Sequence, residues 1–535
     1  MRFVSLPTFV CLSTLLTLAA CSKDDSADGE LLGSDGSGSG FGEEGEDDWG
    51  GDGDPSTGGD GDGDTTGGDP GDGDTGDEPP AETGDGDGDG DGDPEPACND
   101  VDDVVLYLSP DDSNSMSAPV QVRERVLAVG STSLAGVPIR TWEFMNYYGF
   151  PYPAADDGTL GLHAAIQPVE AAESTWRLQL AVASEIMTPD ERPPMNVTLV
   201  LDTSGSMGGE PIALLKETSR AIAASLRAGD KVSVVEWDTT NTWSLGGYAV
   251  TGPNDATLLG VIDAIEANGG TNLNGGLVSG YQLAQQVYDA AAINRLVLIS
   301  DGGANAGITD IDLIAQNAAF GGSDGIYLVG VGVGDSGYND DLMNDVTDAG
   351  KGASVFIADN LEAWTRFNAD FENTMAIAAR NVQVELTLPP GFEIVKFSGE
   401  EYSGDPKEVE PQHIAPNDAM VFHQQIQTCA PELMTDDTPI TVKATWEDPW
   451  SFATQELEQT WTYAELADMD QTLLLKGAAV LAYAESLQAY KLAYTNDEKA
   501  TALAPAFEAL MAAQAVIPGD EDLGEIAAVL AALEG

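Results

Sequence analysis

The sequence has few basic residues, few histidines and few cysteines, and each shortage excludes a class of function. Only 21 residues are Lys or Arg, against 91 Asp and Glu, so the formal net charge is -70. A chain this acidic repels nucleic-acid phosphates, and we expect no nucleic-acid partner. The three His and four Cys are too few and too scattered for a zinc ligand set.

Long apolar runs are also missing after the amino terminus, which leaves no candidate membrane-spanning helix. Residues 1–21 combine one Arg, an apolar stretch and small residues, and this pattern predicts a secretory signal. The letters LAAC, ending at Cys21, resemble the lipobox of bacterial lipoproteins, and the resemblance implies lipidation of Cys21. Ser22 resembles the outer-membrane sorting pattern. We expect an outer-membrane lipoprotein of the bacterial cell envelope, on the periplasmic side or the cell surface, held to the membrane by its lipid alone.

Residues 22–97 are short of apolar side chains. They contain 27 Asp and Glu, 24 Gly and one Lys. Such a segment cannot bury enough apolar surface to offset its conformational entropy, so we predict a disordered acidic tether.

Two cysteines remain once the signal and the lipid site are assigned. Cys98 and Cys429 would then stand in an oxidising compartment. They form a disulfide or remain two thiols, and the sequence leaves both possibilities open.

Residues 191–380 alternate short apolar strands with helical stretches, and the predicted helices include 309–319 and 360–379. The strands are rich in β-branched residues and apolar on both faces, as in VTLVLD (197–202) and RLVLISD (295–301). This pattern is typical of a parallel sheet covered by helices, so we predict an α/β, doubly wound, Rossmann-like domain. Ligands of such sheets bind beyond the carboxyl ends of the strands.

The flanking segments have a different pattern. Polar and apolar residues alternate over 174–186, before the α/β domain, and in several stretches of 381–465, after it. We expect the segment 98–190 to pair with an antiparallel, sandwich-like β domain at 381–465, with the α/β domain inserted between them. Residues 466–535 carry apolar stripes at helical spacing and predict a helical region.

Five oxygen-bearing side chains follow the predicted strands or stand in a Gly-rich loop of the α/β domain. They are Asp202, Ser204, Ser206, Thr271 and Asp301. Short hydroxyl and carboxylate side chains supply the hard oxygen ligands that Mg²⁺ prefers. We therefore predict a divalent metal site, with Mg²⁺, Ca²⁺ and Mn²⁺ left open. A coordination position left open on the ion would attract a carboxylate from a partner.

The same residues carry a family resemblance. DTSGSM (202–207), the Thr of GGTN and the Asp of ISDG resemble the von Willebrand factor type A (VWA) domain, and they fill all five positions of its metal-ion-dependent adhesion site (MIDAS). IRTWEFMNYYGFPYP (139–153) and GVGVGDSGYNDDLMNDVTDAGKG (330–352) resemble a bacterial lipoprotein family built on this domain, which is often labelled as a calcium-activated chloride channel homologue. The missing spanning segment gives the channel label no support.

These observations favour a binding protein over an enzyme. We expect adhesion or assembly through metal-dependent capture of a protein or glycan, and no catalysis. The alternative is a structural envelope scaffold with an idle metal site. A hydrolase comes third, because the chain has only His163, His413 and His423, and none lies in the α/β domain.

Overall fold

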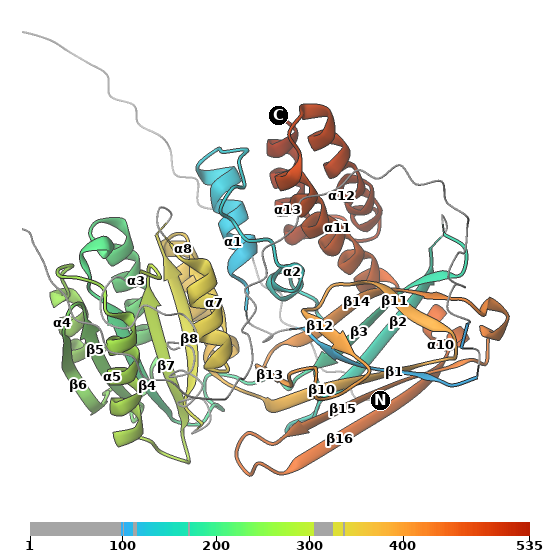
Figure 1. Ribbon diagram of the computed structural model, residues 1–535. Helices are drawn as coiled ribbons and strands as arrows, with labels where there is room; N and C mark the ends of the chain where they lie inside the picture. The colour runs from blue at the N-terminus through green and yellow to red at the C-terminus, as the bar shows by residue number, and fades with distance from the viewer. Residues whose placement is uncertain (1–97, 100, 111–114, 170–171, 304–324, 335–337) are drawn as a thin grey trace, which may run out of the picture. The chain divides into compact units, whose positions relative to one another are not determined.

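Three sheets organise the part of the chain that this computed structural model describes: residues 98–535 without 100, 111–114, 170–171, 304–324 and 335–337 (Figure 1). The predicted signal, the tether, the lipid site Cys21 and a predicted helix at 309–319 lie outside the described residues.

The predicted α/β domain is confirmed. Its described strands follow the order β6-β5-β4-β7-β8-β9. All neighbours pair in parallel except β6, an antiparallel edge strand beside β5. The bounds are β4 (Met195–Asp202), β5 (Lys231–Trp237), β6 (Asn241–Ala249), β7 (Ile293–Ser300), β8 (Tyr327–Val333) and β9 (Ser354–Ile357). The sequence did not predict β6, because this partly exposed edge strand is largely polar and contains two adjacent glycines.

Helices cover both faces of this sheet (Figure 1). Leu199 packs with Leu215 of α3 in one buried cluster, whereas the next strand residue, Val200, packs with Leu277 of α5 in another. One face carries α3 (Glu210–Ser225), α4 (Ala256–Ala264), α8 (Asn360–Trp364), the π-helix η3 (Thr365–Ala369) and α9 (Phe371–Met375); the other carries α5 (Leu273–Gln286) and α7 (Asp340–Ala349). The single helix predicted at 360–379 is therefore interrupted.

Two antiparallel sheets form a sandwich around a shared core. One has the order β12-β1-β10-β15-β16, with β13 also paired to β10, and the other has the order β11-β14-β3-β2. The bounds are β1 (Val104–Ser109), β2 (Gly161–Pro168), β3 (Thr175–Ala183), β10 (Ala379–Leu388), β11 (Phe392–Phe397), β12 (Glu401–Ser403), β13 (Gln412–Ile414), β14 (Ala419–Thr428), β15 (Pro439–Glu447) and β16 (Thr454–Thr462). Strands from before and after the α/β domain pair within each sheet, so that domain is inserted into the sandwich.

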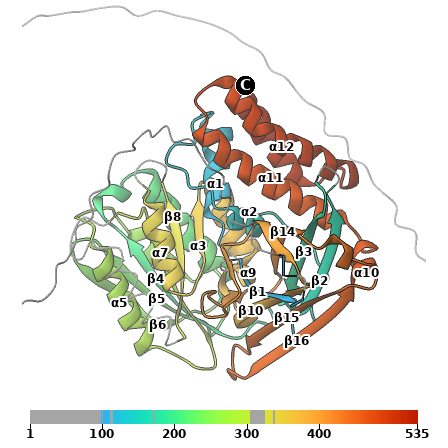
Figure 2. The ribbon, with the colours of Figure 1, turned by 45° about the vertical axis from the view of Figure 1, so that its right-hand side comes forward.

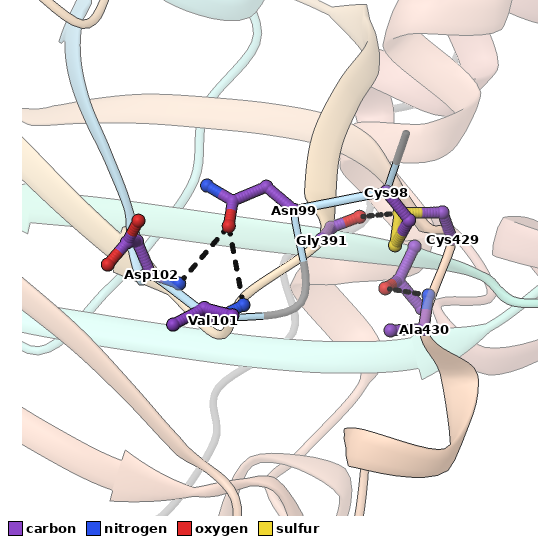
Figure 3. The surroundings of a disulfide bond; sticks show 8 residues. Cys98, Asn99, Val101, Asp102, Gly391, Cys429 and Ala430 are labelled. Carbon is purple, nitrogen blue, oxygen red and sulfur yellow. Dashed lines mark hydrogen bonds between the residues drawn. A yellow bond between two sulfur atoms is a disulfide. The ribbon is translucent and has the colours of Figure 1, made fainter. Parts of the chain in front are cut away.

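A disulfide joins Cys98 to Cys429, with their Cα atoms 5.8 Å apart (Figure 3). Cys98 precedes β1 in one sheet and Cys429 follows β14 in the other. The bond closes a loop with a sequence separation of 331 residues, which contains the whole α/β domain.

The carboxyl-terminal helices pack on the sandwich and on helices from the amino-terminal segment. Figure 2 shows α11 beside β14 and β3. The bounds are α1 (Ser117–Arg123), the π-helix η1 (Glu124–Ala128), α2 (Thr141–Tyr147), α10 (Tyr463–Ala467), α11 (Thr472–Leu492), α12 (Asn496–Val516) and α13 (Glu521–Glu534). Phe144 of α2 and Tyr483 of α11 share one buried cluster, with ring centroids 5.5 Å apart. Within the described residues, no helix combines the length and apolar character needed to cross a bilayer.

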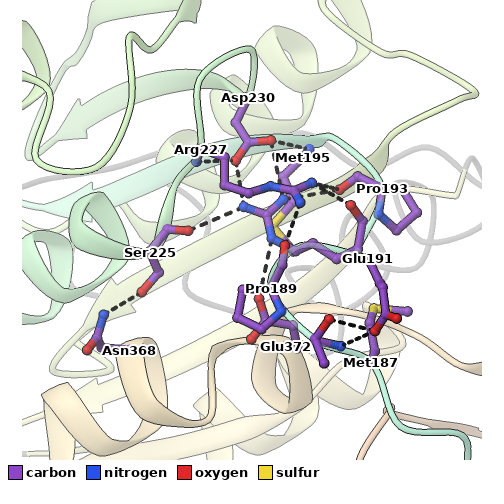
Figure 4. Close-up of polar contacts among 12 residues, drawn as sticks. Met187, Pro189, Glu191, Pro193, Met195, Ser225, Arg227, Asp230, Asn368 and Glu372 are labelled. Carbon is purple, nitrogen blue, oxygen red and sulfur yellow. Dashed lines mark hydrogen bonds and ion pairs between the residues drawn. The ribbon is translucent and has the colours of Figure 1, made fainter.

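A buried ion pair holds the segment that enters the α/β domain (Figure 4). Arg192 Nη2 lies 2.6 Å from Asp230 Oδ2, and both side chains are almost completely buried. The amides of Met195 and Arg227 also donate to the Asp230 carboxylate, at 2.9 and 2.7 Å. Burial acts to raise the pKa of Asp230, but Arg192 and the two amides hold it below its ordinary value. The start of β4 is therefore fixed beside the turn that precedes β5.

Candidate metal site

The first loop of the predicted site begins at Asp202, the last residue of β4. Asp202 is fully buried, and its Oδ1 accepts a hydrogen bond of 2.8 Å from the Ser204 amide. The chain then forms a short 3₁₀ turn, η2 (Gly205–Met207), before α3 begins. The Oγ atoms of Ser204 and Ser206 lie 3.0 Å apart. Ser204 is buried whereas Ser206 is exposed, so this loop runs from the interior to the surface.

Thr271 lies in the loop between α4 and α5, which contacts the first loop directly. The Gly205 amide donates to the Gly269 carbonyl at 3.1 Å, and the Asn268 amide donates to the Thr203 carbonyl at 2.6 Å. A Cβ at Gly205 would lie 3.1 Å from the Gly269 oxygen. The two loops can therefore come this close because Gly205 has no side chain. Thr271 is itself buried.

Asp301 follows β7 and completes the set of three loops. Ser300 Oγ donates to Asp202 Oδ2 at 2.6 Å, which ties the end of β7 to the end of β4. The Gly303 amide donates to Asp301 Oδ1 at 3.0 Å. A Cβ at Gly303 would lie 3.0 Å from Asp301 Oδ1 and 3.8 Å from Thr271 Oγ1. The Asp301 carboxylate and the Thr271 hydroxyl therefore both lie close to Gly303.

The electrostatics of the site suit a cation. Burial, with a smaller contribution from Asp301, raises the pKa of Asp202 to about 6, although hydrogen bonds from Ser300 and Ser204 lower it. The hydrogen-bond donors to Asp202 and Asp301 described above are neutral hydroxyls and amides. Two neighbouring buried carboxylates with such neutral donors are stabilised by a bound positive charge.

The donor set also differs from the common protein metal sites. No group of three or more His, Cys, Asp and Glu gathers as a metal site among the residues that the structure describes. The predicted set instead combines two carboxylates with the hydroxyls of two Ser and one Thr, and such hard neutral oxygens fit Mg²⁺, Ca²⁺ or Mn²⁺. Sequence reasoning missed Ser300, which orients Asp202. Its place directly before Asp301 was the signal that could have found it.

Comparisons with known proteins agree with this fold. Residues 196–370 match the family model of the von Willebrand factor type A domain. The uncharacterized protein YfbK of Escherichia coli (strain K12) is 26% identical over 263 residues, which cover 48% of this chain and 45% of that protein. The chain thus spans about half the length of this relative.

Two solved structures are similar at low identity. A von Willebrand factor type A protein from Catenulispora acidiphila has 16% identity and a TM-score of 0.45, and the match covers 69% of this chain and 89% of that chain. Proximal thread matrix protein 1 of the mussel byssus, whose structure has a zinc-occupied MIDAS motif, has 14% identity and a TM-score of 0.28, over 32% of this chain and 46% of that chain. The zinc is a property of that protein. From the family match and from the sheet with its three loops, we conclude that this chain contains a von Willebrand factor type A domain.

Proposed function

We propose that the VWA domain binds a divalent cation and uses it to capture a partner. Asp202, Ser204, Ser206, Thr271 and Asp301 would hold the ion, with Mg²⁺ the first candidate and Ca²⁺ or Mn²⁺ the alternatives. The observation that supports this most directly is the meeting of the three loops, in which Ser300 bonds Asp202 at 2.6 Å and Gly205 bonds Gly269 at 3.1 Å. When bound, the ion would supply a positive site for a carboxylate oxygen of the partner.

The partner is a protein or glycan that offers such a carboxylate. Ser206 is exposed, so the proposed site opens to solvent beside it. We further propose that the protein acts in adhesion or assembly in the bacterial envelope, as an outer-membrane lipoprotein anchored at Cys21. Binding, and no catalysis, is the proposed role. In the competing scaffold hypothesis, the sandwich and helices make the contacts and the metal site is idle.

Metal binding is tested by thermal unfolding of the full chain with and without Mg²⁺. A ligand that binds only the folded state raises the unfolding temperature as its concentration exceeds the dissociation constant. We expect Mg²⁺ to stabilise the wild type, and to stabilise Asp202→Asn and Ser206→Ala less. Ser206 is exposed, so its variant should fold normally, and Ser133→Ala, an exposed serine outside the loops, is the matched control. Equal magnesium shifts in all four proteins would contradict the site.

Partner capture is tested by an envelope pull-down with the same proteins. Proteins retained by the wild type in Mg²⁺ should be lost in chelator and with Asp202→Asn, but kept with Ser133→Ala. If the same proteins are retained in chelator and by Asp202→Asn, the result would support the scaffold hypothesis instead.

A further inference from the structure

A second candidate site lies at the other end of the α/β sheet, where its parallel strands begin. A cavity of about 100 Å³ opens where β7 and β8 begin, whereas the metal loops follow the ends of β4 and β7. Tyr288, Trp450 and Phe452 line it, and these rings are 42%, 41% and 52% exposed. Exposed Trp and Tyr beside an Arg have the composition of binding hot spots in protein interfaces.

Arg380 supplies the positive charge of this cavity. Its guanidinium carbon lies 4.3 Å from the ring centroid of Phe452 and 5.2 Å from that of Tyr327. The nearby carboxylate of Glu447 instead accepts from Asn381 Nδ2, at 3.0 Å. In the part of the chain that the structure describes, Arg380 has no ion pair with a carboxylate, although the net charge is -70. Contact with both rings holds a guanidinium that no carboxylate of the described residues neutralises.

Two buried polar atoms at the cavity make no hydrogen bond of normal geometry among the described residues, although the two side chains lie beside one another. Tyr327 is only 6% exposed and lines the cavity, and its hydroxyl makes no hydrogen bond of normal geometry with the described residues. The same is true of Arg380 Nε. Buried polar atoms are usually satisfied in folded proteins, so Arg380 Nε and the neighbouring Tyr327 hydroxyl are candidate donors to an acceptor that enters the cavity.

The aromatic rim is held in place by its own turn. Asp448 Oδ1 accepts from the amides of Trp450 and Ser451, at 3.1 and 2.7 Å, and Phe452 has a φ of +57°. A positive φ is rare for a bulky residue and persists only where the surroundings impose it. The ring of Phe452 is therefore presented to Arg380 by a defined turn.

We propose that this cavity binds a polypeptide segment that presents a carboxylate beside an apolar side chain, such as a chain that ends in Phe. Arg380 and the Tyr327 hydroxyl would donate to the carboxylate, since guanidinium pairs with carboxylate through charge-assisted bonds. The side chain would stack on Trp450 and Phe452. The cavity of about 100 Å³ has room for an apolar side chain, and aromatic pairs contribute beyond the burial of their area.

The test is a calorimetric titration of the full chain with two probes that differ in one group. N-acetyl-phenylalanine carries the carboxylate, and N-acetyl-phenylalaninamide does not. We expect the wild type to bind the acid at least about tenfold more tightly than the amide, because hydrogen bonds to charged groups are the stronger ones. Arg380→Gln should remove this preference, whereas Trp450→Ala should weaken both probes. Arg125→Gln is the matched control and should bind as the wild type does.

Three results would overturn the proposal. They are equal binding of acid and amide by the wild type, a preference for the acid that survives in Arg380→Gln, and binding of neither probe at about 10 mM, the weak end of specific recognition. A repeat in chelator separates the two sites, because this cavity lies away from the metal loops and its acid preference should not change.

Discussion

Gly477 tests how closely α11 packs on the sandwich. In an exposed helix, replacing Gly by Ala stabilises the fold by up to about 1 kcal/mol. At Gly477, however, a Cβ would lie 1.9 Å from Gln179 Oε1 and 3.0 Å from His423 Nδ1. We therefore expect Gly477→Ala to destabilise the protein.

The magnitude follows from the contacts that Gln179 would have to give up. Gln179 is fully buried, and its Nε2 donates to Tyr152 Oη at 2.8 Å and to the Leu473 carbonyl at 3.0 Å. Its Oε1 lies 2.8 Å from His423 Nδ1. Overpacking a core costs about 1–3 kcal/mol, and each lost hydrogen bond adds roughly 1 kcal/mol. The net loss should be about 2–4 kcal/mol of unfolding free energy.

The assay is urea unfolding followed by circular dichroism, with hydrogen exchange of peptides from α11 as a local readout. Gly524→Ala in α13 is the matched control, because nothing lies within 4 Å of a Cβ there. That variant should be neutral or slightly stabilised. In the background of Gln179→Ala, which removes the obstructing side chain, Gly477→Ala should cost little more. If Gly477→Ala proves as stable as Gly524→Ala, the described packing of α11 on β3 and β14 is wrong.

Three further predictions concern buried groups. Burial lowers the pKa of His423 from 6.5 to about 3. Between pH 7 and pH 5 this imidazole is therefore protonated only in the unfolded chain, and it alone should lower the free energy of unfolding by about 2 kcal/mol. His423→Asn should lose less over that interval in urea unfolding, and an equal loss would contradict the assignment. Arg192→Met should cost about 3 kcal/mol in the same assay by leaving Asp230 buried without its cation, and adding Asp230→Asn should recover part of the loss. Reduction of the disulfide should lower the free energy of unfolding by about 2–4 kcal/mol in the wild type and leave that of Cys98→Ser/Cys429→Ser unchanged. If a reductant leaves the urea midpoints of both proteins unchanged, the bond is absent.

The α/β domain was largely predictable because its signals are local. The strand that ends at Asp202 reads as a continuous apolar run, since parallel strands are buried on both faces. The metal loops could also be predicted, because two of them begin where such an apolar run stops and the third is a Gly-rich loop before a helix. The edge strand Asn241–Ala249 could not be predicted, since it is partly exposed and its sequence is largely polar.

Features that depend on distant contacts could not be predicted. The helix predicted at 360–379 ends early because Ala379 starts β10, which pairs with β1 and β15 from far along the chain. Likewise, nothing local to Arg380 shows that Tyr327 and Phe452 stack on it.

By itself the sequence determined three features: the parallel sheet covered by helices, the five oxygen-bearing residues in its loops, and the antiparallel strands on either side. Each of them follows from the periodicity or spacing of residues that are close in the sequence. Only the tertiary structure decided that Cys98 meets Cys429, that Ser300 orients Asp202, and that Arg380 lies close to the rings of Tyr327 and Phe452. These contacts join residues from separate loops and strands. They depend on packing and burial in the whole fold, so no local sequence pattern predicts them.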